Sequence, residues 1–232
     1  MSGLIYNSNL IMYDRRDDQS LYPQMYFTAF QGPRRGESLR LLPITETTLG
    51  TWKRLHPDTE VIALSSQTYE ESRYEIYPYG DYRTENRLVS SVDPIMTRNN
   101  SPYAGDHGWK ELTLGVRLNG EPKAYVFEDM GERIVINDHL GGEDILVVWD
   151  RDSQLALPYW RQVDGRSLTF TLDPDVGFPF SLIDEETGSR WDILGVATEG
   201  PLAGQRLVQI PAHNSFWFAW VTFWQETEKW TP

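Results

Sequence analysis

Leu182-Ile-Asp-Glu-Glu-Thr-Gly-Ser-Arg-Trp-Asp-Ile-Leu194 begins the stretch that decides the fold, because these residues and those after them, up to Glu228, occur twice in the chain. Residues 32–60 lie over residues 200–228 without a gap, at a constant offset of 168 positions. The offset matches Gly32 to Gly200, Pro33 to Pro201, Gly36 to Gly204, Leu39 to Leu207, Pro43 to Pro211, Trp52 to Trp220 and Thr59-Glu60 to Thr227-Glu228. One small insertion then brings residues 13–22 onto residues 183–191. Such self-similarity indicates an internal duplication.

The sequence from Leu112 onward predicts antiparallel β structure. Short apolar runs are separated by turn residues, and Asn119-Gly120 between two such runs is typical of a two-residue hairpin turn. Strands are expected at 3–13, 25–30, 39–42, 61–64, 112–118, 123–127, 133–137, 144–149, 157–160 and 167–172. Helices are expected at 49–55, capped by Thr47 or Thr48, and at 213–225. The predicted fold class is mainly β, a sandwich or barrel of antiparallel sheets with one short helix in each half.

The duplication divides the chain into three predicted segments. Residues 1–64 form an incomplete first copy, residues 65–110 a tyrosine-rich connection, and residues 111–232 a complete second copy, packed together as one globular unit. Positions 115–168 have no counterpart, because the offset places them before Met1. The first copy is then completed by the connection or by another chain, or its sheet has an open edge that recruits partners. We expect a partner or an upstream segment.

Composition excludes several classes of protein. The formal charge is −13, from 34 acidic and 21 basic residues, which disfavours contact with nucleic acid or with an anionic membrane surface. The chain contains no cysteine, which excludes disulfides, thiolate nucleophiles and cysteine-ligated metals. It has no apolar run of about 20 residues that could span a bilayer and no signal peptide, so we expect a soluble chain.

The predicted helix at 213–225 is more apolar than its counterpart. Both copies keep one apolar face, but the second copy has four further apolar residues where the first copy has polar residues or glycine. These are Phe216 for Thr48, Phe218 for Gly50, Val221 for Lys53 and Trp224 for His56. Either the connection or the chain end covers them as part of the core, or they form a docking surface for another protein or for the membrane interface. On the second interpretation, Phe216, Phe218, Val221 and Trp224 are interaction residues.

Candidates for chemistry are few. The four histidines show no metal-ligand spacing, and neighbours such as Asp138-His139 point to opposite faces of a strand. Asp184-Glu185-Glu186 suits a glycosidase or a calcium loop. However, only Asp184 has an acidic counterpart, Asp14, which favours a turn-stabilising role. His213 lies beside Ser215 without an orienting carboxylate in the local sequence. Asp138, His139, Asp184 and His213 are therefore the possible ligand residues.

The chain has no nucleophile elbow, no phosphate-binding glycine loop and no dinucleotide fingerprint, so no cofactor or metal is expected.

Several long motifs in this chain resemble a known family, and together they cover nearly all of it. They are Ser2-Gly-Leu-Ile-Tyr-Asn-Ser-Asn-Leu-Ile-Met-Tyr-Asp-Arg15, His56-Pro-Asp-Thr-Glu60, Asp184-Glu-Glu-Thr-Gly-Ser-Arg-Trp191, Gly200-Pro-Leu-Ala-Gly204 and Pro211-Ala-His-Asn-Ser-Phe-Trp-Phe-Ala-Trp220. They look like the bacterial and archaeal domain of unknown function (DUF) 3179 family. The resemblance implies an extracytoplasmic location and no established activity. Family members usually carry a cysteine-bearing motif upstream of the part that matches residues 2–6, and this chain lacks it.

These observations favour a non-catalytic accessory or interaction subunit. We expect it to dock on a larger, possibly membrane-associated complex, or to form a homo-oligomer, through its aromatic surface and open sheet edge. The alternative is a hydrolase, or a small-ligand or metal-binding protein, that uses the carboxylates and histidines named above.

Overall fold

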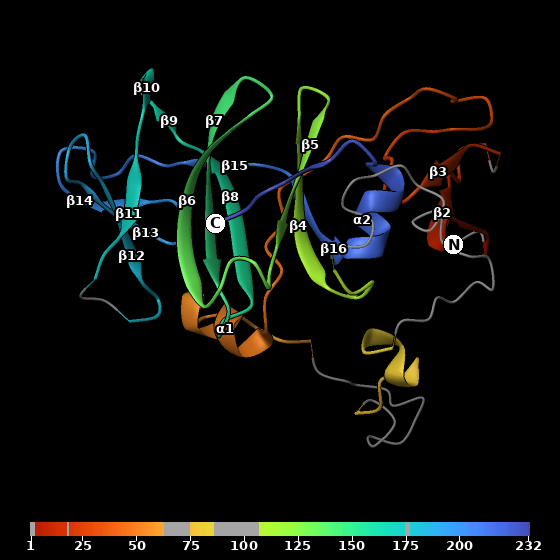
Figure 1. The fold of residues 1–232 in the computed structure, drawn as a ribbon, viewed down its shortest axis with the longest axis horizontal. Coiled ribbons are helices and arrows are strands. Elements are labelled where there is room, and N and C mark those ends of the chain that lie inside the picture. The colour runs from red at the N-terminus through yellow and green to blue at the C-terminus, as the bar shows by residue number, and fades with distance from the viewer. Residues whose placement is uncertain (1–2, 18, 63–74, 86–106, 175–176) are drawn as a thin grey trace.

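The computed structural model describes residues 3–17, 19–62, 75–85, 107–174 and 177–232. Its elements stack as layers along the long axis of the molecule (Figure 1). From one end to the other the layers are an end sheet of the second copy, two central sheets, the helix α2, and an end sheet of the first copy.

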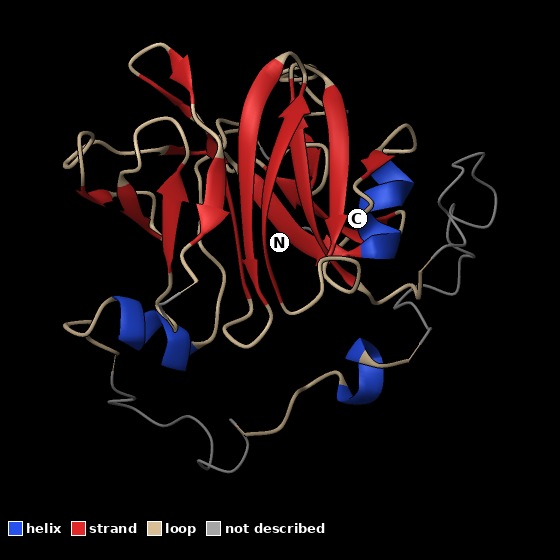
Figure 2. Cartoon of the chain, turned by 60° about the vertical axis from the view of Figure 1, so that its left-hand side comes forward, coloured by secondary structure: helices blue, strands red, loops and turns tan. Residues whose placement is uncertain are grey.

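The two central sheets have four strands each and stand side by side (Figure 2). One has the order β15-β8-β7-β6 and the other the order β16-β4-β5-β17. The bounds in the first sheet are β6 Arg133–Leu140, β7 Glu143–Asp150, β8 Leu155–Trp160 and β15 Val208–Gln209. The bounds in the second sheet are β4 Leu112–Leu118, β5 Glu121–Val126, β16 Ala212–Phe216 and β17 Glu228–Lys229. All pairings are antiparallel except that of β17 with β5, which is parallel.

The end sheets are smaller. The second copy contributes β11 Phe170–Leu172, β12 Ser181–Asp184, β13 Arg190–Asp192 and β14 Ala197–Glu199, and the first copy contributes β1 Ile5–Tyr6, β2 Asn9–Tyr13 and β3 Leu21–Pro23. A ribbon of β9 Gln162–Val163 and β10 Arg166–Ser167 precedes β11, and a short 3-10 helix spans Gly80–Arg83.

Strand β7 explains why the layers hold together. Leu146 and Val148 point into a core shared with the end sheet, where they meet Trp191. Val147 and Trp149 point to the opposite face and pack in a second core between the central sheets. Because side chains alternate along a strand, a strand with apolar residues at both parities must be covered on both faces. This arrangement is the sandwich-like one, and the described sheets do not close into a barrel.

The duplication is visible in the backbone of both helices. Helix α1, Leu49–Leu55, and helix α2, Trp217–Phe223, begin and end at positions that the offset of 168 matches. The His56 amide donates to the Trp52 carbonyl at 2.8 Å, and the Trp224 amide donates to the Trp220 carbonyl at 2.9 Å. Thr48 caps α1 through its side chain, whereas the equivalent Phe216 gives α2 no side-chain cap.

The loops repeat as closely as the helices. An isolated bridge joins Thr28 to Ser38, and its counterpart joins Val196 to Arg206. Gly200 has a φ of 90°, and an added Cβ would lie 2.7 Å from the Cα of Ser189, so only glycine fits where this loop crosses the strand. The internal duplication is therefore a property of the fold, while the boundaries of the three segments stay a prediction.

Several local predictions need correction. Residues 25–30 form no strand, apart from the bridge at Thr28, because a turn closed by bonds from the Tyr26 and Phe27 amides to the Pro23 carbonyl begins this segment. Residues 39–42 form no strand because no described strand pairs with them. The helix expected at 213–225 is only α2, since residues 212–216 pair with β4 as β16. Residues 61 and 62 are irregular, and residues 63–64 lie outside the described residues, as does most of the connection.

The hairpin prediction is confirmed. Asn119 and Gly120 join β4 to β5 with φ values of 49° and 93°, the pair of positive angles that a type I′ turn requires.

Replacing Gly115 by alanine tests how tightly α2 is held against the sheet. The added Cβ would lie 2.1 Å from the ring of Trp220, so the helix must move. We expect a loss of about 1–3 kcal/mol in the free energy of unfolding, as in other overpacked cores, measured by urea denaturation. The control is Gly177→Ala, where nothing lies within 4 Å. Equal stability of the two variants would contradict this packing.

Candidate binding surface

Helix α2 lies inside the molecule. Phe218 is 3% exposed and Val221 is fully buried, and they share a core with Met25 of the first copy and Val126 of β5. Of the two interpretations that the sequence left open, core packing is the one found for these two side chains. Phe216 and Trp224, at the two ends of the helix, are half-buried.

The first copy supplies the cover for α2. The ring of Tyr26 meets the ring of Phe223 edge-on at 4.8 Å and that of Trp224 at 5.7 Å. Tyr6 of β1 meets Phe223 from another side at 5.9 Å. Two ends of the chain, far apart in sequence, thus lie side by side, as α2 and β2–β3 do in Figure 1.

Helix α1 is not enclosed in this way. It lies below the central sheet that contains β6 and β8, apart from β2 and β3 (Figure 1). Its contacts include the guanidinium of Arg54, which sits 4.0 Å from the ring centroid of Phe178 and donates to the Phe178 carbonyl at 3.2 Å. Leu49, at the start of the helix, remains 55% exposed. Its counterpart Trp217 is 0% exposed.

The segment that leads into α1 carries a row of exposed apolar side chains. We call residues 39–48 the first arm and residues 207–216 the second arm. We call the large apolar side chains of the first arm and of the next residue, Leu49, that are exposed by more than a third the first-arm face. They are Leu39 (38%), Leu41 (38%), Leu42 (63%), Ile44 (69%) and Leu49 (55%).

The second arm shows what normally covers these positions. Leu207 and Ile210, the counterparts of Leu39 and Leu42, are 6% and 1% exposed. Strand β8 pairs with β15, and the Ile210 amide donates to the carbonyl of Pro158 at 2.9 Å. Strand β4 then pairs with β16 over five residues. The second arm is thus hydrogen-bonded to two strands of its own copy, β8 and β4.

The first arm is attached at its start, where the Leu39 amide donates to the Phe27 carbonyl at 2.7 Å, and again near its end. The Thr47 hydroxyl donates to the Ser153 carbonyl at 2.6 Å, and the side-chain amide of Gln209 donates to the Ile44 carbonyl at 3.1 Å. The two arms therefore meet between the central sheets. A strand pairing like that of β15 with β8 is absent from the described part of the first arm.

A cavity of about 530 Å³ lies where the arms approach their helices. Its lining includes Glu46–Thr48 from the first arm and the counterpart positions Asn214–Phe216 from the second, together with Lys110 and Phe127. The Lys110 ammonium lies 3.0 Å from the ring centroid of Tyr82 at its mouth. A volume of this size is within the range of small-molecule sites.

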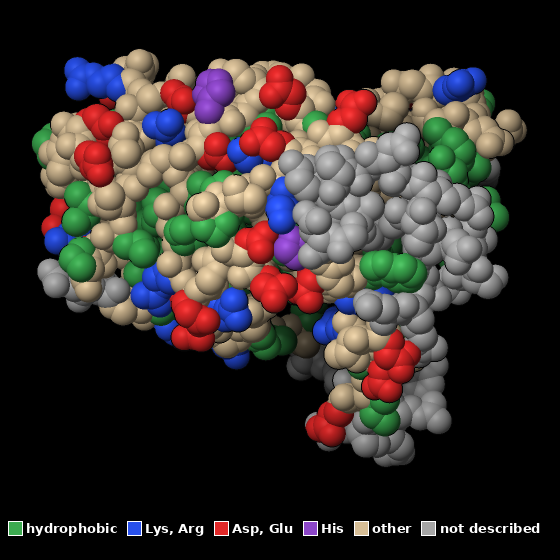
Figure 3. All heavy atoms as spheres, in the orientation of Figure 1, with side chains coloured by type: hydrophobic (Ala, Val, Ile, Leu, Met, Phe, Trp, Pro, Cys, Tyr) green, Lys and Arg blue, Asp and Glu red, His purple; other side chains and the backbone are tan. Residues whose placement is uncertain are grey.

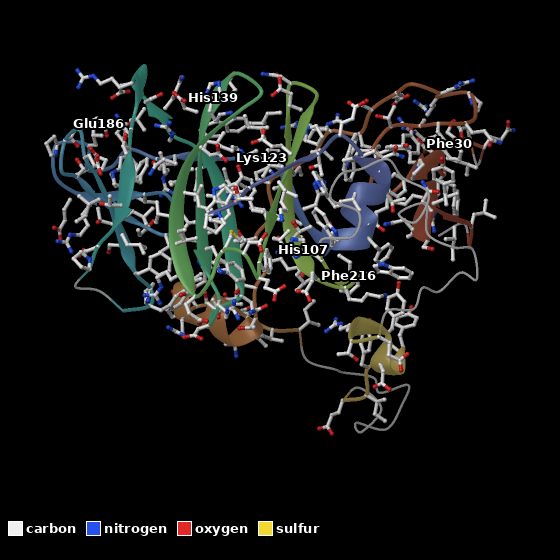
Figure 4. All side chains as sticks on the ribbon, viewed as in Figure 1. Phe30, His107, Lys123, His139, Glu186 and Phe216 are labelled. Carbon is white, nitrogen blue, oxygen red and sulfur yellow. The ribbon has the colours of Figure 1, made fainter. Side chains whose placement is uncertain are left out.

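The predicted ligand residues do not come together. Asp138 on β6 accepts hydrogen bonds from Lys123 at 2.9 Å and from the Tyr125 hydroxyl at 2.8 Å. Burial by itself raises the pKa of Asp138, but these donors and the His139 amide hold that pKa below its ordinary value. His139 lies at the end of its sheet (Figure 4), where its ring contacts Asp144 at 3.0 Å.

Asp184 is enclosed in the end sheet of the second copy. It accepts hydrogen bonds from the Thr187 amide at 2.6 Å and from the indole nitrogen of Trp191 at 2.9 Å. Asp14 accepts from the Arg16 amide at 2.8 Å in the equivalent turn. Both aspartates hold turns, the role that the shared position indicates.

His213 is on β16, in a different sheet from Asp138 and Asp184. Its ring stacks on Phe27 at 4.4 Å and lies 6.3 Å from Trp220. Burial lowers its pKa, Arg117 lowers it further, and a hydrogen bond with the Gly115 backbone partly opposes both effects. Asp138, Asp184 and His213 share none of these hydrogen-bonded or stacked partners.

The described residues contain neither a metal-binding group of side chains nor a helix that could span a membrane. No group of three histidine or acidic side chains there could hold a metal ion. No helix in that part of the chain combines the length and apolarity needed to cross a membrane. On the face shown in Figure 3, acidic and basic side chains are interspersed.

Fold and surface together define a mainly β, internally duplicated protein with one enclosed and one exposed copy of the same arm. The family model described as "Protein of unknown function (DUF3179)" matches residues 1–227, so the chain belongs to this family. No curated protein and no solved structure matches the chain.

The first-arm face was missed at the level of sequence. The available signal was that Leu39, Leu42 and Leu49 are apolar at positions where the second copy is also apolar. Their exposure depends on strands that pair with the second arm alone, which the residues themselves do not reveal.

His213 gives a testable pH dependence. Its folded pKa lies below the ordinary value of 6.5, so the stability it contributes is complete above that value and is lost as pH falls through the folded pKa. We expect the free energy of unfolding to fall between pH 7 and pH 5, and His213→Phe to flatten this slope. Denaturant titrations at each pH measure it.

The matched control is His139→Phe, because the His139 side chain is 63% exposed. This variant should keep the wild-type slope. If the pH dependence of stability persisted in His213→Phe and disappeared in His139→Phe, its assignment to His213 would be wrong.

Proposed function

We propose that this chain is a non-catalytic accessory subunit that docks on a larger protein through the first-arm face. The observation that carries the proposal is the distribution of exposed large apolar side chains in the described residues. Eleven of them lie between Leu4 and Ile62, whereas only Leu112 and Val208 lie between residues 107 and 232. The first copy therefore exposes what the second copy buries.

The energetic argument supports docking. Fully burying one leucine or isoleucine side chain contributes about 1.5–3 kcal/mol, so covering Leu42, Ile44 and Leu49, each more than half exposed, would be favourable. Contiguous exposed apolar surface on a folded protein is typical of interaction sites. The five side chains of the first-arm face lie along one extended segment and at the start of α1, within reach of a single partner.

The docking surface differs from the one expected from the sequence. Phe218 and Val221 are core residues, so the proposed contact moves from α2 to the first arm and α1. The open sheet edge is retained in the proposal, because the first arm lacks a described pairing strand. An extracytoplasmic location, on a complex that includes membrane proteins, is part of the same proposal.

The alternative is a small-ligand binding protein or a hydrolase. The cavity lined by both arms supports ligand binding. The hydrolase has less support, because Asp138, Asp184 and His213 each satisfy separate local contacts.

A paired substitution tests the docking function. Leu42→Asp with Ile44→Asp should remove a stoichiometric companion protein when the full chain is purified under mild conditions from its natural source. Both side chains are more than 60% exposed, so thermal stability of the isolated chain should change little. Native mass and subunit stoichiometry are the measurements.

Ile76→Asp is the matched control, because Ile76 is 68% exposed but lies outside the first-arm face. It should retain the companion. If the double variant keeps the same companion in the same ratio, or if wild type has none, the docking function is wrong.

A further inference from the structure

We infer that the first arm binds an apolar β-strand of a partner protein, paired antiparallel along residues 40–42. This inference rests on the proposed function and specifies its mode of contact. The second arm supplies the template, because β15 and Ile210 are held by β8 in this manner. Addition of a strand to an open edge gives affinity through main-chain hydrogen bonds and specificity through alternate side chains.

The offset of 168 fixes the register. Val208 faces Trp160 and Gln209 faces Tyr159, so Arg40 and Leu41 occupy the corresponding positions in the first arm. The Leu42 amide then corresponds to that of Ile210, which donates to β8. All residues from 37 to 44 are exposed, so a strand can approach this edge.

The two faces of the bound strand must both be apolar. In the second copy, Leu207 packs in one core together with Tyr159, and Ile210 packs in the other core together with Ala156. Leu39 and Leu42 therefore point toward opposite faces of the incoming strand. An amphipathic strand with one polar face would leave one of these leucines in water.

One position distinguishes the partner strand from β8 itself. Gly195 lies close to the Tyr159 ring, since an added Cβ would be 3.0 Å from it. The counterpart of Gly195 is Phe27, which also has a positive φ of 56°. A tyrosine at the matching position of the partner strand would meet the Phe27 side chain. The partner therefore carries a small side chain there.

Strand β8 of a second molecule does not satisfy these conditions. It is already paired on both sides, by β7 and β15, and carries Tyr159 at the restricted position. The occupant that we infer is an unpaired strand of a different protein, with small and apolar residues.

The test supplies such a strand within the protein. Residues 108–170, with Tyr159→Ala in the added copy only, are placed ahead of residue 1 of the full chain. The insertion point follows the offset of 170 between Asp14 and Asp184. Hydrogen exchange of the Arg40 and Leu42 amides, which match the hydrogen-bonded positions 208 and 210, should slow by about tenfold or more, as it does for paired strands, and the melting temperature should rise. Leu42→Pro in the fusion removes the donor and should abolish that protection.

Three results would overturn the inference. The added segment acquires protected strands while residues 40–42 exchange as in the parent chain, or it stays unprotected throughout, or the parent chain forms a stable dimer through this arm. If Leu42→Asp with Ile44→Asp releases a companion protein but the fusion shows no protection, docking stands and strand pairing fails. If no companion depends on these residues, the proposed function itself fails.

Discussion

The close contact between Trp220 and Gly115 sets the spacing on which the layered structure depends. A helix that is apolar on every side must be covered on every side. Gly115 lets the helix approach the sheet on one side, and Met25 and Tyr26 of the first copy cover the other. The end sheet of the first copy is thereby fixed to an element of the second copy. Without this contact the layers would have no common core at that end.

Comparison of the two copies distinguishes the features that both repeats share from the features that only one repeat has. Leu39 and Leu42 of the first arm match the apolar residues Leu207 and Ile210 of the second, but only the second arm is held by β4 and β8. The difference between Ile210 at 1% exposure and Leu42 at 63% is a difference in covering, since both residues are apolar. The exposed copy is therefore where an interaction has the most free energy to gain.

Much of the fold follows from the sequence because the decisive signals are local. The hairpin at Asn119-Gly120 and the bounds of β4 and α1 depend on residues close in sequence, and the duplication is a direct comparison of two stretches of sequence. Predictions failed where a distant partner decides. Residues 213–216 were predicted as helix because they are continuous with α2, yet they pair with β4 as part of strand β16. Phe218 was a candidate surface residue because Met25, which covers it, is almost 200 positions away.

The candidate site was predictable only in part. The sequence identified the shared aspartates as turn residues, and Asp184 holds its turn through Thr187. It did not place the exposed face, because leucine in an extended segment gives the same pattern whether it is buried or exposed. Tertiary contacts determine which of the two similar patterns is enclosed, so this becomes clear only when the pairing strands are known.

The sharing of α2 between the copies bears on how this protein can change over generations. In sequence, α2 belongs to the second repeat, but its side chains also form the core beneath Met25 and Tyr26 of the first repeat. Neither repeat can be replaced on its own by a related sequence, because the replacement would not preserve the packing between α2 and the first copy. The two copies are therefore interdependent, and a substitution in α2 affects the packing of both.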